Sequence, residues 1–331
     1  MGLVAIVGVL GCEAQPVAVQ FFPPDTNNIP IPLVDSAELA SNVLVVGNLR
    51  SVTVPTFDGS GEATEPDVLV GWHGWEFWMA MSPYPHGDAT FERPSVVVSG
   101  NGAIFETPRG GHNPVADDSI QTSDPDLQVV RDTLWLVYRV NTSTQDSLLM
   151  RRTGDGTHWL PSQGLNLRGP WASLLSPALI VTDSFRLWTV NAPSGGCRTT
   201  ASYVERRSSS DGVDWGPPDT VQVGVPGWVV WHIDVTQIEG SYMMLYAAFP
   251  TGGTCGAGGT LFLATSADGR VWTSYPRPVL APNRYLASGI YRSSMELVGN
   301  QVELWYSGVN GSIWRLATER LALAELMNRV R

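Results

Sequence analysis

Acidic and polar side chains recur at one position in five similar segments of the chain. Each segment precedes a run rich in aromatic and β-branched residues, which is typical of a β-strand. Aligned on the Pro of Asp124-Pro125-Asp126-Leu127, the first position of the segments is occupied by Glu65, Asp124, Ser176, His232 and Arg292. The spacings between these residues are 59, 52, 56 and 60. The third position holds Asp67, Asp126, Ala178, Asp234 and Ser294.

The first and third positions of a strand point to the same face, so these side chains can converge. Convergent carboxylates beside an Arg suit acid–base hydrolysis of a glycosidic bond, because one carboxyl holds a proton while its partner is ionised. We therefore predict catalytic roles for four acidic residues: Asp124, Glu65, Asp67 and Asp234. Substrate-binding roles are predicted for Asp126, His232, Arg292, Tyr291, Glu92 and Trp231.

Each of these residues also has a simpler alternative role. Asp124 and Asp126 could cap turns where a strand begins, since turn-forming Asp is common. Glu92 could form a plain ion pair with Arg93. His232 could bind a sugar, hold an ion in the channel or be a satisfied structural histidine, and a lone His is weak evidence for a metal. No metal ligands and no required cofactor are predicted beyond this channel ion.

A sequence repeat indicates which elements position these residues. Residues 154–159 match residues 210–215 and 267–272 in an Asp-Gly-x-x-Trp pattern, and residues 100–105 are a weaker copy. The anchor positions 101, 155, 211 and 268 lie 54, 56 and 57 residues apart. Asp-Gly or Asn-Gly after a β-rich run predicts a hairpin turn. The pattern resembles sialidase Asp boxes with one residue fewer, which implies a structural role.

Five units of about 55 residues, each with the content of four strands, predict an all-β, five-bladed β-propeller. The blades are expected over residues 60–108, 118–165, 172–220, 228–277 and 286–325, within a single domain of residues 13–331. Few residues follow the fifth hairpin, so an N-terminal strand within residues 42–54 is expected to complete the last blade. Residues 318–331 are expected to form a short helix or tail. A tandem of sandwiches is the competing fold, but it does not explain the evenly spaced hairpins.

Composition limits the partners of the protein. The 331 residues carry a net charge of −11, and all 20 basic residues are Arg. An acidic chain without a basic cluster argues against nucleic acid or anionic membranes as partners. No stretch of about 20 apolar residues occurs, so no transmembrane helix is predicted. A neutral carbohydrate is the partner that the acidic and aromatic positions favour.

The N-terminus and the cysteines point to export. The run Val9-Leu10-Gly11-Cys12 resembles a bacterial lipoprotein signal, which implies a signal segment over residues 1–12 and a lipid anchor on Cys12. No basic residue precedes the run, and a buried N-terminal strand is the alternative. Cys197 and Cys255 each lie in a Gly-rich turn, 14 and 13 residues before Asp211 and Asp268.

Equivalent loops of neighbouring repeats lie close in space, so we predict a disulfide between these two cysteines. A disulfide fits an extracellular or periplasmic location. Two free buried thiols are the alternative.

Residues 75–85, 92–96, 112–114 and 123–127 resemble the group of five-bladed glycosidases that includes glycoside hydrolase family 43 and the fructosidases. The resemblance implies a base on blade one, a second Asp on blade two that tunes it, and a Glu on blade three as the acid. Asp124 matches the blade-two residue, and Glu65, with Asp67 two residues on, matches blade one. Blade three has Ser176, so the general acid is missing unless Glu92, Asp234 or Glu65 supplies it.

Two hypotheses of function follow from these residues. The first is an exported glycoside hydrolase that acts at the channel mouth on a neutral polysaccharide or oligosaccharide. The second is a non-catalytic glycan-binding or surface-assembly propeller that has lost the acid. The fold alone does not decide between them, because propellers carry many functions.

Overall fold

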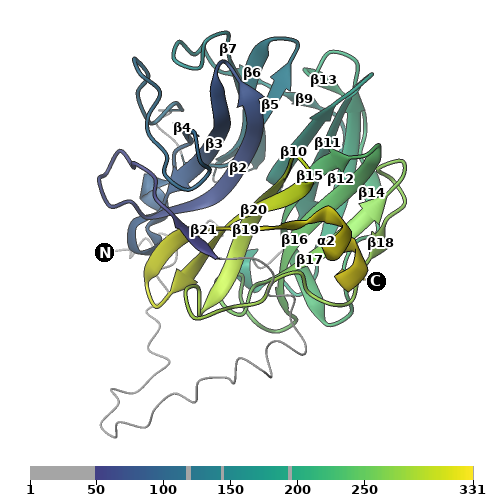
Figure 1. Ribbon diagram of the computed structural model, residues 1–331. Helices are drawn as coiled ribbons and strands as arrows, with labels where there is room; N and C mark the ends of the chain where they lie inside the picture. Colours follow the sequence, from purple (N-terminus) through teal and green to yellow (C-terminus); the bar gives the residue numbers. More distant parts are fainter. Residues whose placement is uncertain (1–48, 117–120, 143–144, 193–195, 331) are drawn as a thin grey trace, which may run out of the picture.

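The protein is an all-β, five-bladed propeller, as predicted (Figure 1). The computed structural model describes residues 49–116, 121–142, 145–192 and 196–330. Each blade is a meander of antiparallel strands that starts at the central axis and runs outward. One helix, α2 (Leu323–Val330), follows the last strand. The expected helix or tail at residues 318–331 is corrected here, because β21 (Ile313–Ala322) continues through the first part of that segment.

The strands are given blade by blade, from the axis outward. Blade one contains β2 (Ala63–Trp72), β3 (Trp75–Pro83) and β4 (Ser95–Ser99). Blade two contains β5 (Thr122–Val130), β6 (Thr133–Asn141), β7 (Asp146–Thr153) and β8 (Gln163–Gly164). Blade three contains β10 (Leu175–Val181), β11 (Phe185–Asn191), β12 (Tyr203–Ser209) and β14 (Asp219–Val221). Blade four contains β15 (Trp228–Ile238), β16 (Ser241–Pro250), β17 (Thr260–Ser266) and β18 (Thr273–Ser274). Blade five contains β19 (Gly289–Val298), β20 (Gln301–Asn310), β21 and β1 (Arg50–Val52).

Short elements connect the blades. Two two-residue strands, β9 (Asn166–Leu167) and β13 (Asp214–Trp215), pair in parallel between blades two and three. The single-turn helices are η1 (Pro85–Gly87), η2 (Ala89–Phe91) and η3 (Gly196–Arg198). Blade one departs from the expected four strands, since its sheet has three and an isolated bridge between Val98 and Glu106 takes the outer position.

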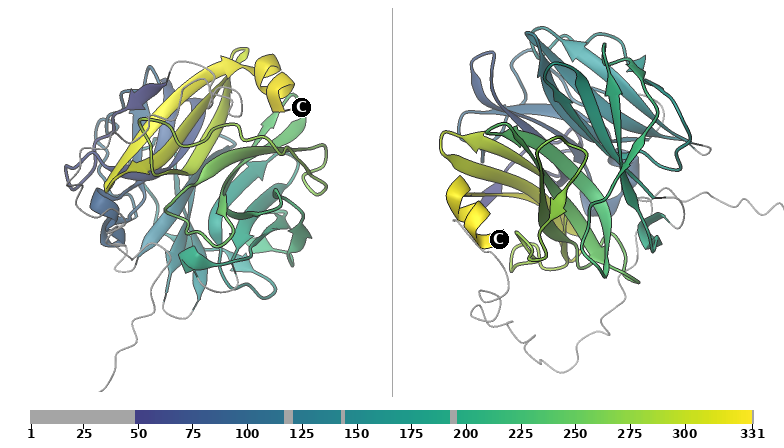
Figure 2. Two further views of the ribbon diagram at one scale, coloured as in Figure 1. Left: turned by 90° about the horizontal axis from the view of Figure 1, so that it is seen from below. Right: turned by 90° about the vertical axis from the view of Figure 1, so that its right-hand side faces the viewer.

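Blade five is closed by the N-terminal strand, as predicted. In β1, Arg50 pairs with Thr318 and Val52 with Leu316 of β21, and the two strands lie side by side in Figure 2 (left). Arg50 forms an ion pair with the fully buried Glu303 of β20, whose carboxylate also binds Arg320. The remainder of the expected strand segment, residues 42–48, lies outside the described residues.

The repeated Asp-Gly turns, and the Asn-Gly turn of blade one, each contact the preceding blade. In the second blade, Asp155 Oδ1 accepts the N–H groups of Thr157 and His158, and Gly156 takes a left-handed φ of 78°. A Cβ on Gly156 would lie 2.1 Å from the Trp78 ring of blade one. The same contact recurs in the other copies, as the pairs Gly212–Trp135, Gly269–Trp188 and Gly102–Trp305. The turns are therefore structural, and each packs on an indole of the preceding blade.

The predicted disulfide is present. Cys197 of η3 and Cys255 of the loop after β16 form a bridge between blades three and four, at a sequence separation of 58. The backbone N–H of Cys255 also donates to the carbonyl of Cys197, at 3.0 Å. The bridge is consistent with an oxidising compartment.

None of the helices in the described part of the chain has the length and apolar character needed to cross a membrane. Cys12 and the rest of residues 1–12 lie outside the described residues, so the lipid anchor stays a prediction.

Candidate functional site

A break in strand register places the first-position residues. The pairing of β2 with β3, of β5 with β6 and of β10 with β11 shifts at Glu65, Asp124 and Ser176. These residues have left-handed φ values of 57°, 54° and 48°, which are costly for residues other than Gly. Each is followed by Pro, which has no N–H group to leave unpaired at a bulge. The inner strands of blades four and five have bulges at the equivalent place.

Asp124 is the centre of the first-position residues. Its backbone N–H donates to Glu65 Oε2 at 2.8 Å. Its Oδ1 lies 3.2 Å from His232 Nδ1 and 3.2 Å from Arg292 Nη1. The hydroxyl of Ser176 lies 2.5 Å from the same His232 nitrogen. The predicted alignment is therefore confirmed, since all five residues meet where the inner strands converge, each buried to within 1% of complete burial.

Asp124 is held as a carboxylate. Burial alone would raise its pKa, but the charge of Arg139, the hydrogen bond and charge of His232, and the charge of Arg292 together hold the pKa well below its usual range. Arg292 is also placed by backbone groups, because its Nη2 donates to the Pro125 carbonyl at 3.1 Å and to the Pro177 carbonyl at 3.4 Å.

Three of these residues make a candidate metal site. Glu65, Asp124 and His232 each offer one ligand atom, and these atoms all lie within 4.8 Å of one another. Two carboxylates and one imidazole are a donor set that suits divalent transition metals. From the sequence, no metal ligands are predicted and only an ion near His232 is expected. The convergence of these three residues follows from the alignment, whereas the close approach of their ligand atoms depends on the bulges, which spacing along the chain does not report.

The third-position residues link adjacent blades. In four of the five blades, the third-position side chain accepts a backbone N–H of the following blade, over distances of 2.6 to 3.2 Å. The donor residue and its acceptor are, in turn, Leu127 and Asp67, Leu179 and Asp126, Met295 and Asp234, and Val68 and Ser294. Ala178 has no such side chain, so the described residues contain no link of this kind from blade three to blade four. The predicted catalytic and binding roles of these Asp residues stay predictions.

Burial and mutual repulsion favour protons on the third-position carboxyls. Burial, followed by the charge of Asp234, raises the pKa of Asp67 to about 8. Burial raises the pKa of Asp234 to about 6. Burial and the charge of Asp67 raise the pKa of Asp126 well above its usual value. The inner strands thus carry an ionised carboxylate at Asp124 together with three carboxyls whose pKa values burial raises.

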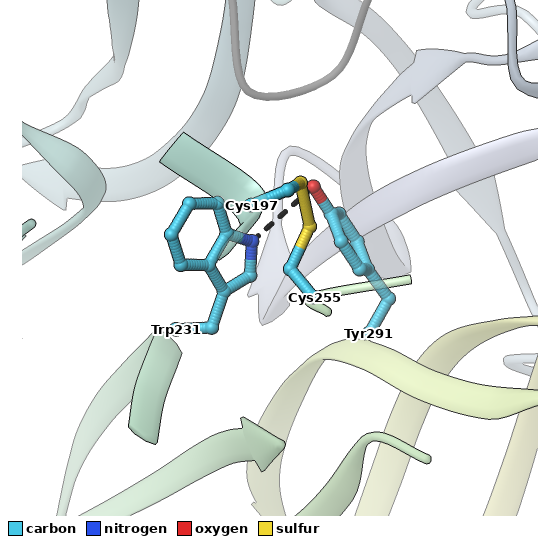
Figure 3. Close-up of a disulfide and its surroundings, with 4 residues drawn as sticks. All are labelled: Cys197, Trp231, Cys255 and Tyr291. Atoms are coloured by element: carbon cyan, nitrogen blue, oxygen red, sulfur yellow. Dashed lines mark hydrogen bonds between the residues drawn. A yellow bond between two sulfur atoms is a disulfide. The ribbon is translucent and has the colours of Figure 1, made fainter. Parts of the chain in front are cut away.

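Aromatic residues surround His232. The Tyr291 ring stands edge-on to the imidazole at 4.3 Å between centroids, and Trp231 is edge-on at 5.9 Å. Trp231 Nε1 donates to the Tyr291 hydroxyl at 3.4 Å, and the Cys197–Cys255 disulfide lies against this pair (Figure 3). Both predicted binding residues are therefore next to the candidate site, but both are also buried, at 1% and 4% exposure.

The structure brings one further residue to the site that the sequence analysis missed. Arg139 of β6 is buried, and its Nε donates to Asp124 Oδ2 at 2.7 Å. Glu92, by contrast, lies after η2 and accepts a hydrogen bond from Gln121, just before β5. The pairing of β5 with β6 places Arg139 opposite Ser123, the residue before Asp124. This strand register is the signal that would have identified Arg139 as a neighbour of Asp124.

No family model matches this chain. The chain is 24% identical over 314 residues to the A type blood N-acetyl-alpha-D-galactosamine deacetylase of Flavonifractor plautii, a match over 75% of this chain and 40% of that protein. The chain thus spans less than half of the length of that relative.

Solved structures share the fold. The crystal structure of an N-acetylgalactosamine deacetylase from F. plautii with blood group B trisaccharide superimposes with a TM-score of 0.76 and 22% identity, over 86% of this chain and 97% of that one. A thermostable family-43 glycoside hydrolase superimposes with a TM-score of 0.62 and 14% identity, over 79% and 90%. The protein is therefore a five-bladed β-propeller related in fold to family-43 glycoside hydrolases and to the F. plautii deacetylase.

Proposed function

We propose that this protein is a metal-dependent amide hydrolase that removes the acetyl group from an N-acetylated sugar of a glycan. The observation that carries the proposal is the buried group of Glu65, Asp124 and His232, whose ligand atoms lie within 4.8 Å of one another. The residues present fit a divalent metal by the chemistry of their donors. When bound, such a metal supplies Lewis-acid activation of water and of a carbonyl oxygen.

The spacing argues against an inverting glycosidase that uses Glu65 and Asp124 as its acid and base. Inverting glycosidases place their carboxyls about 6.5–9.5 Å apart. One oxygen of Glu65 and one of Asp124 lie within 4.8 Å of each other. The blade-three position that holds the acid in family 43 is Ser176, whose hydroxyl contacts His232 instead.

The neighbouring side chains have consistent roles in this proposal. Ser176 and Asp124 both face Nδ1 of His232 and so fix the orientation of its ring. Arg292 puts a permanent positive charge beside Asp124, where it can stabilise negative charge that develops on a carbonyl oxygen. The Tyr291 ring packs edge-on to the imidazole ring of His232 and limits the rotation of that ring.

Similarity supports the same choice. The F. plautii protein is a deacetylase of N-acetylgalactosamine by its name, and its structure has a higher TM-score than the family-43 enzyme, 0.76 against 0.62. Because this chain covers 40% of that relative, its substrate is inferred as a class, an N-acetylated sugar in a glycan.

A glycoside hydrolase is the second candidate, and one observation favours it. The pKa of Asp67 is raised to about 8 by burial and by Asp234, so this carboxyl holds a proton at neutral pH, as a general acid must. Asp67 lies two residues from Glu65 on the same strand. The two candidate activities can be distinguished by their products, since a deacetylase releases acetate and a glycoside hydrolase releases a sugar.

The test measures both products from the same reactions. The purified full chain is incubated with oligosaccharides ending in N-acetylgalactosamine or in a neutral sugar, and free acetate and free monosaccharide are quantified. We expect acetate release that stops on chelation and returns with added Zn²⁺ or Mn²⁺. Asp124→Asn and His232→Ala should lower the rate by at least about 10²-fold, the order of a lost electrostatic contribution to the transition state.

Asp183→Asn is the matched control, because Asp183 is 81% exposed in the turn after β10 and is ion-paired with Arg186. Release of monosaccharide without acetate, insensitive to chelation, would replace the proposal with the glycosidase. Neither product, with retained glycan binding, would identify a carbohydrate-binding propeller.

A further inference from the structure

Arg139 contacts Asp124 from the side opposite to His232. Its Nε donates to Asp124 Oδ2 at 2.7 Å, whereas His232 faces Oδ1 at 3.2 Å. Its Nη2 donates to the hydroxyl of Ser123 at 2.9 Å, the residue directly before Asp124. The guanidinium therefore binds both the carboxylate and the strand that carries it. Both side chains of the ion pair are almost completely buried, at 2% and 0% exposure.

A second carboxylate anchors the arginine. Nη1 of Arg139 lies 3.4 Å from Asp146 Oδ2 on β7. The same oxygen accepts the backbone N–H of Leu174, at 3.0 Å, from the segment that leads into blade three. The Asp146 carbonyl also accepts the indole N–H of Trp171 at 3.0 Å. Arg139 is thus held by its own blade and, through Asp146, by the next.

The contacts of Arg139 do more than neutralise the charge of Asp124. Arg292 already places a cation 3.2 Å from Asp124 Oδ1. Asp124 also occupies a left-handed backbone conformation, with φ 54°, which persists only where surrounding contacts determine it. The guanidinium of Arg139 occupies Oδ2 at the shorter distance, 2.7 Å, whereas Oδ1 faces His232 Nδ1 and Arg292 Nη1, each at 3.2 Å.

We propose that Arg139 is a positioning residue that holds Asp124 as a one-oxygen ligand and so makes the centre select a small transition metal over calcium. The inference rests on the metal centre of the proposed function. Calcium binds six to eight oxygens and often takes both oxygens of a carboxylate. Zinc and its neighbours bind about four nitrogen, oxygen or sulfur donors. Occupation of Oδ2 by Arg139 removes the bidentate mode that calcium uses.

The test measures metal affinity rather than turnover. The full chain is stripped with chelator and titrated separately with Zn²⁺, Co²⁺ and Ca²⁺ by calorimetry. Arg139→Lys keeps the positive charge and loses the planar fork. We expect it to weaken Zn²⁺ and Co²⁺ binding by about 10- to 100-fold, as loss of an outer partner of a ligand does. Ca²⁺ binding should change by less than about threefold, because Oδ2 becomes available to calcium.

Two further variants keep the inference testable if Arg139→Lys does not fold. Asp146→Asn removes the anchor without touching Asp124, and we expect a smaller loss in the same direction. Arg207→Lys is the matched control, because Arg207 is 1% exposed and ion-paired with Glu205 at 3.0 Å in blade three. It should leave all three affinities within about twofold, since it binds no ligand of the centre.

The outcomes separate the inference from the proposed function. A fall in Zn²⁺ affinity with an unchanged Zn²⁺ to Ca²⁺ ratio would show that Arg139 only supports the fold, and would overturn the inference. Unchanged Zn²⁺ affinity in a folded Arg139→Lys would overturn it too, while the metal centre stands. A wild-type chain that binds neither Zn²⁺ nor Co²⁺ would overturn both.

Discussion

A single buried carboxyl in the wall of blade five makes the stability of the protein depend on pH. Glu319 of β21 is 2% exposed and accepts a hydrogen bond from the Tyr306 hydroxyl at 2.5 Å. Burial raises its pKa from 4.5 to about 7, although the hydrogen bond from Tyr306 opposes the shift. Burial and the charge of Glu319 raise the pKa of Tyr306 as well. The pair therefore favours a neutral glutamic acid.

Glu319→Gln should reduce this pH dependence. Between pH 4.5 and about 7 the folded chain keeps a proton that the unfolded chain releases, so stability falls as pH rises through this window. Gln is neutral in both states and keeps an acceptor for Tyr306. We expect the variant to be more stable than wild type at pH 8, by at most about 3 kcal/mol, with the difference vanishing near pH 4. Denaturant unfolding at both pH values measures it.

The exposed Glu76→Gln provides the comparison, since Glu76 lies on the surface of β3. Equal pH dependence in wild type and Glu319→Gln would show that Glu319 titrates normally in the folded protein.

At the scale of elements, the turn between the third and fourth strands is the repeating connection between blades. Each described turn places a glycine with positive φ against an indole of the preceding blade. In two of them the indole N–H also donates to the glycine carbonyl, from Trp305 to Gly102 and from Trp188 to Gly269. The glycine is needed both for its backbone conformation and for the close approach.

Gly156→Ala tests this connection against Gly154→Ala in the same turn. A Cβ at Gly156 would lie 2.1 Å from Trp78, at φ 78°, whereas at Gly154 it would meet nothing within 4 Å. We expect Gly156→Ala to lower the free energy of unfolding by about 3 kcal/mol, from overpacking plus the strained φ. Gly154→Ala should change it by less than about 0.5 kcal/mol. Equal effects in a thermal or denaturant scan would contradict the packing account.

The elements also show how far the sequence alone could lead. The Asp-Gly turns, the disulfide and the alignment of Asp124 with His232 were predictable, because spacing along the chain reports equivalent positions in a repeat. Arg139 was not, since its role depends on which residue of β5 it faces and no motif marks it. The hydrogen bond from the Leu127 N–H to Asp67 was equally unpredictable, because the donor and the acceptor lie on different blades.

At the scale of the whole molecule, two interfaces between blades differ from the rest. Blade five has no third-to-fourth turn, because β1 supplies its outer strand, and β16 of blade four contains no Trp. Aliphatic side chains fill that interface, and Leu326 of α2 is buried among them. Between blades three and four, the described residues contain no third-position side chain that accepts a backbone N–H, because that position is Ala178, and the inner strands meet instead through Ser176 and His232. This is the interface that the disulfide bridges.

Removal of the disulfide should weaken one interface rather than the whole ring. For Cys197→Ser with Cys255→Ser, we expect the free energy of unfolding to fall by about 4 kcal/mol, from chain entropy at a separation of 58 residues. Hydrogen exchange should rise most in β10 and β15, the inner strands on either side of the gap. The inner strands β2 and β5 serve as the internal control, because the Asp67 carboxylate ties them. Uniform acceleration in all five blades would argue against a local role.

The bulges of the inner strands have a consequence for how such proteins change activity. At Glu65, Asp124 and Ser176 the backbone itself, through its left-handed φ, aims the side chain at the axis. The direction of the side chain at these positions is consequently set by the backbone rather than by the residue type. Each blade contributes one first-position residue at the axis. A new chemistry there requires substitutions at these five positions rather than a different fold. Ser176, at the blade-three position that holds the acid in family 43, is one such substitution.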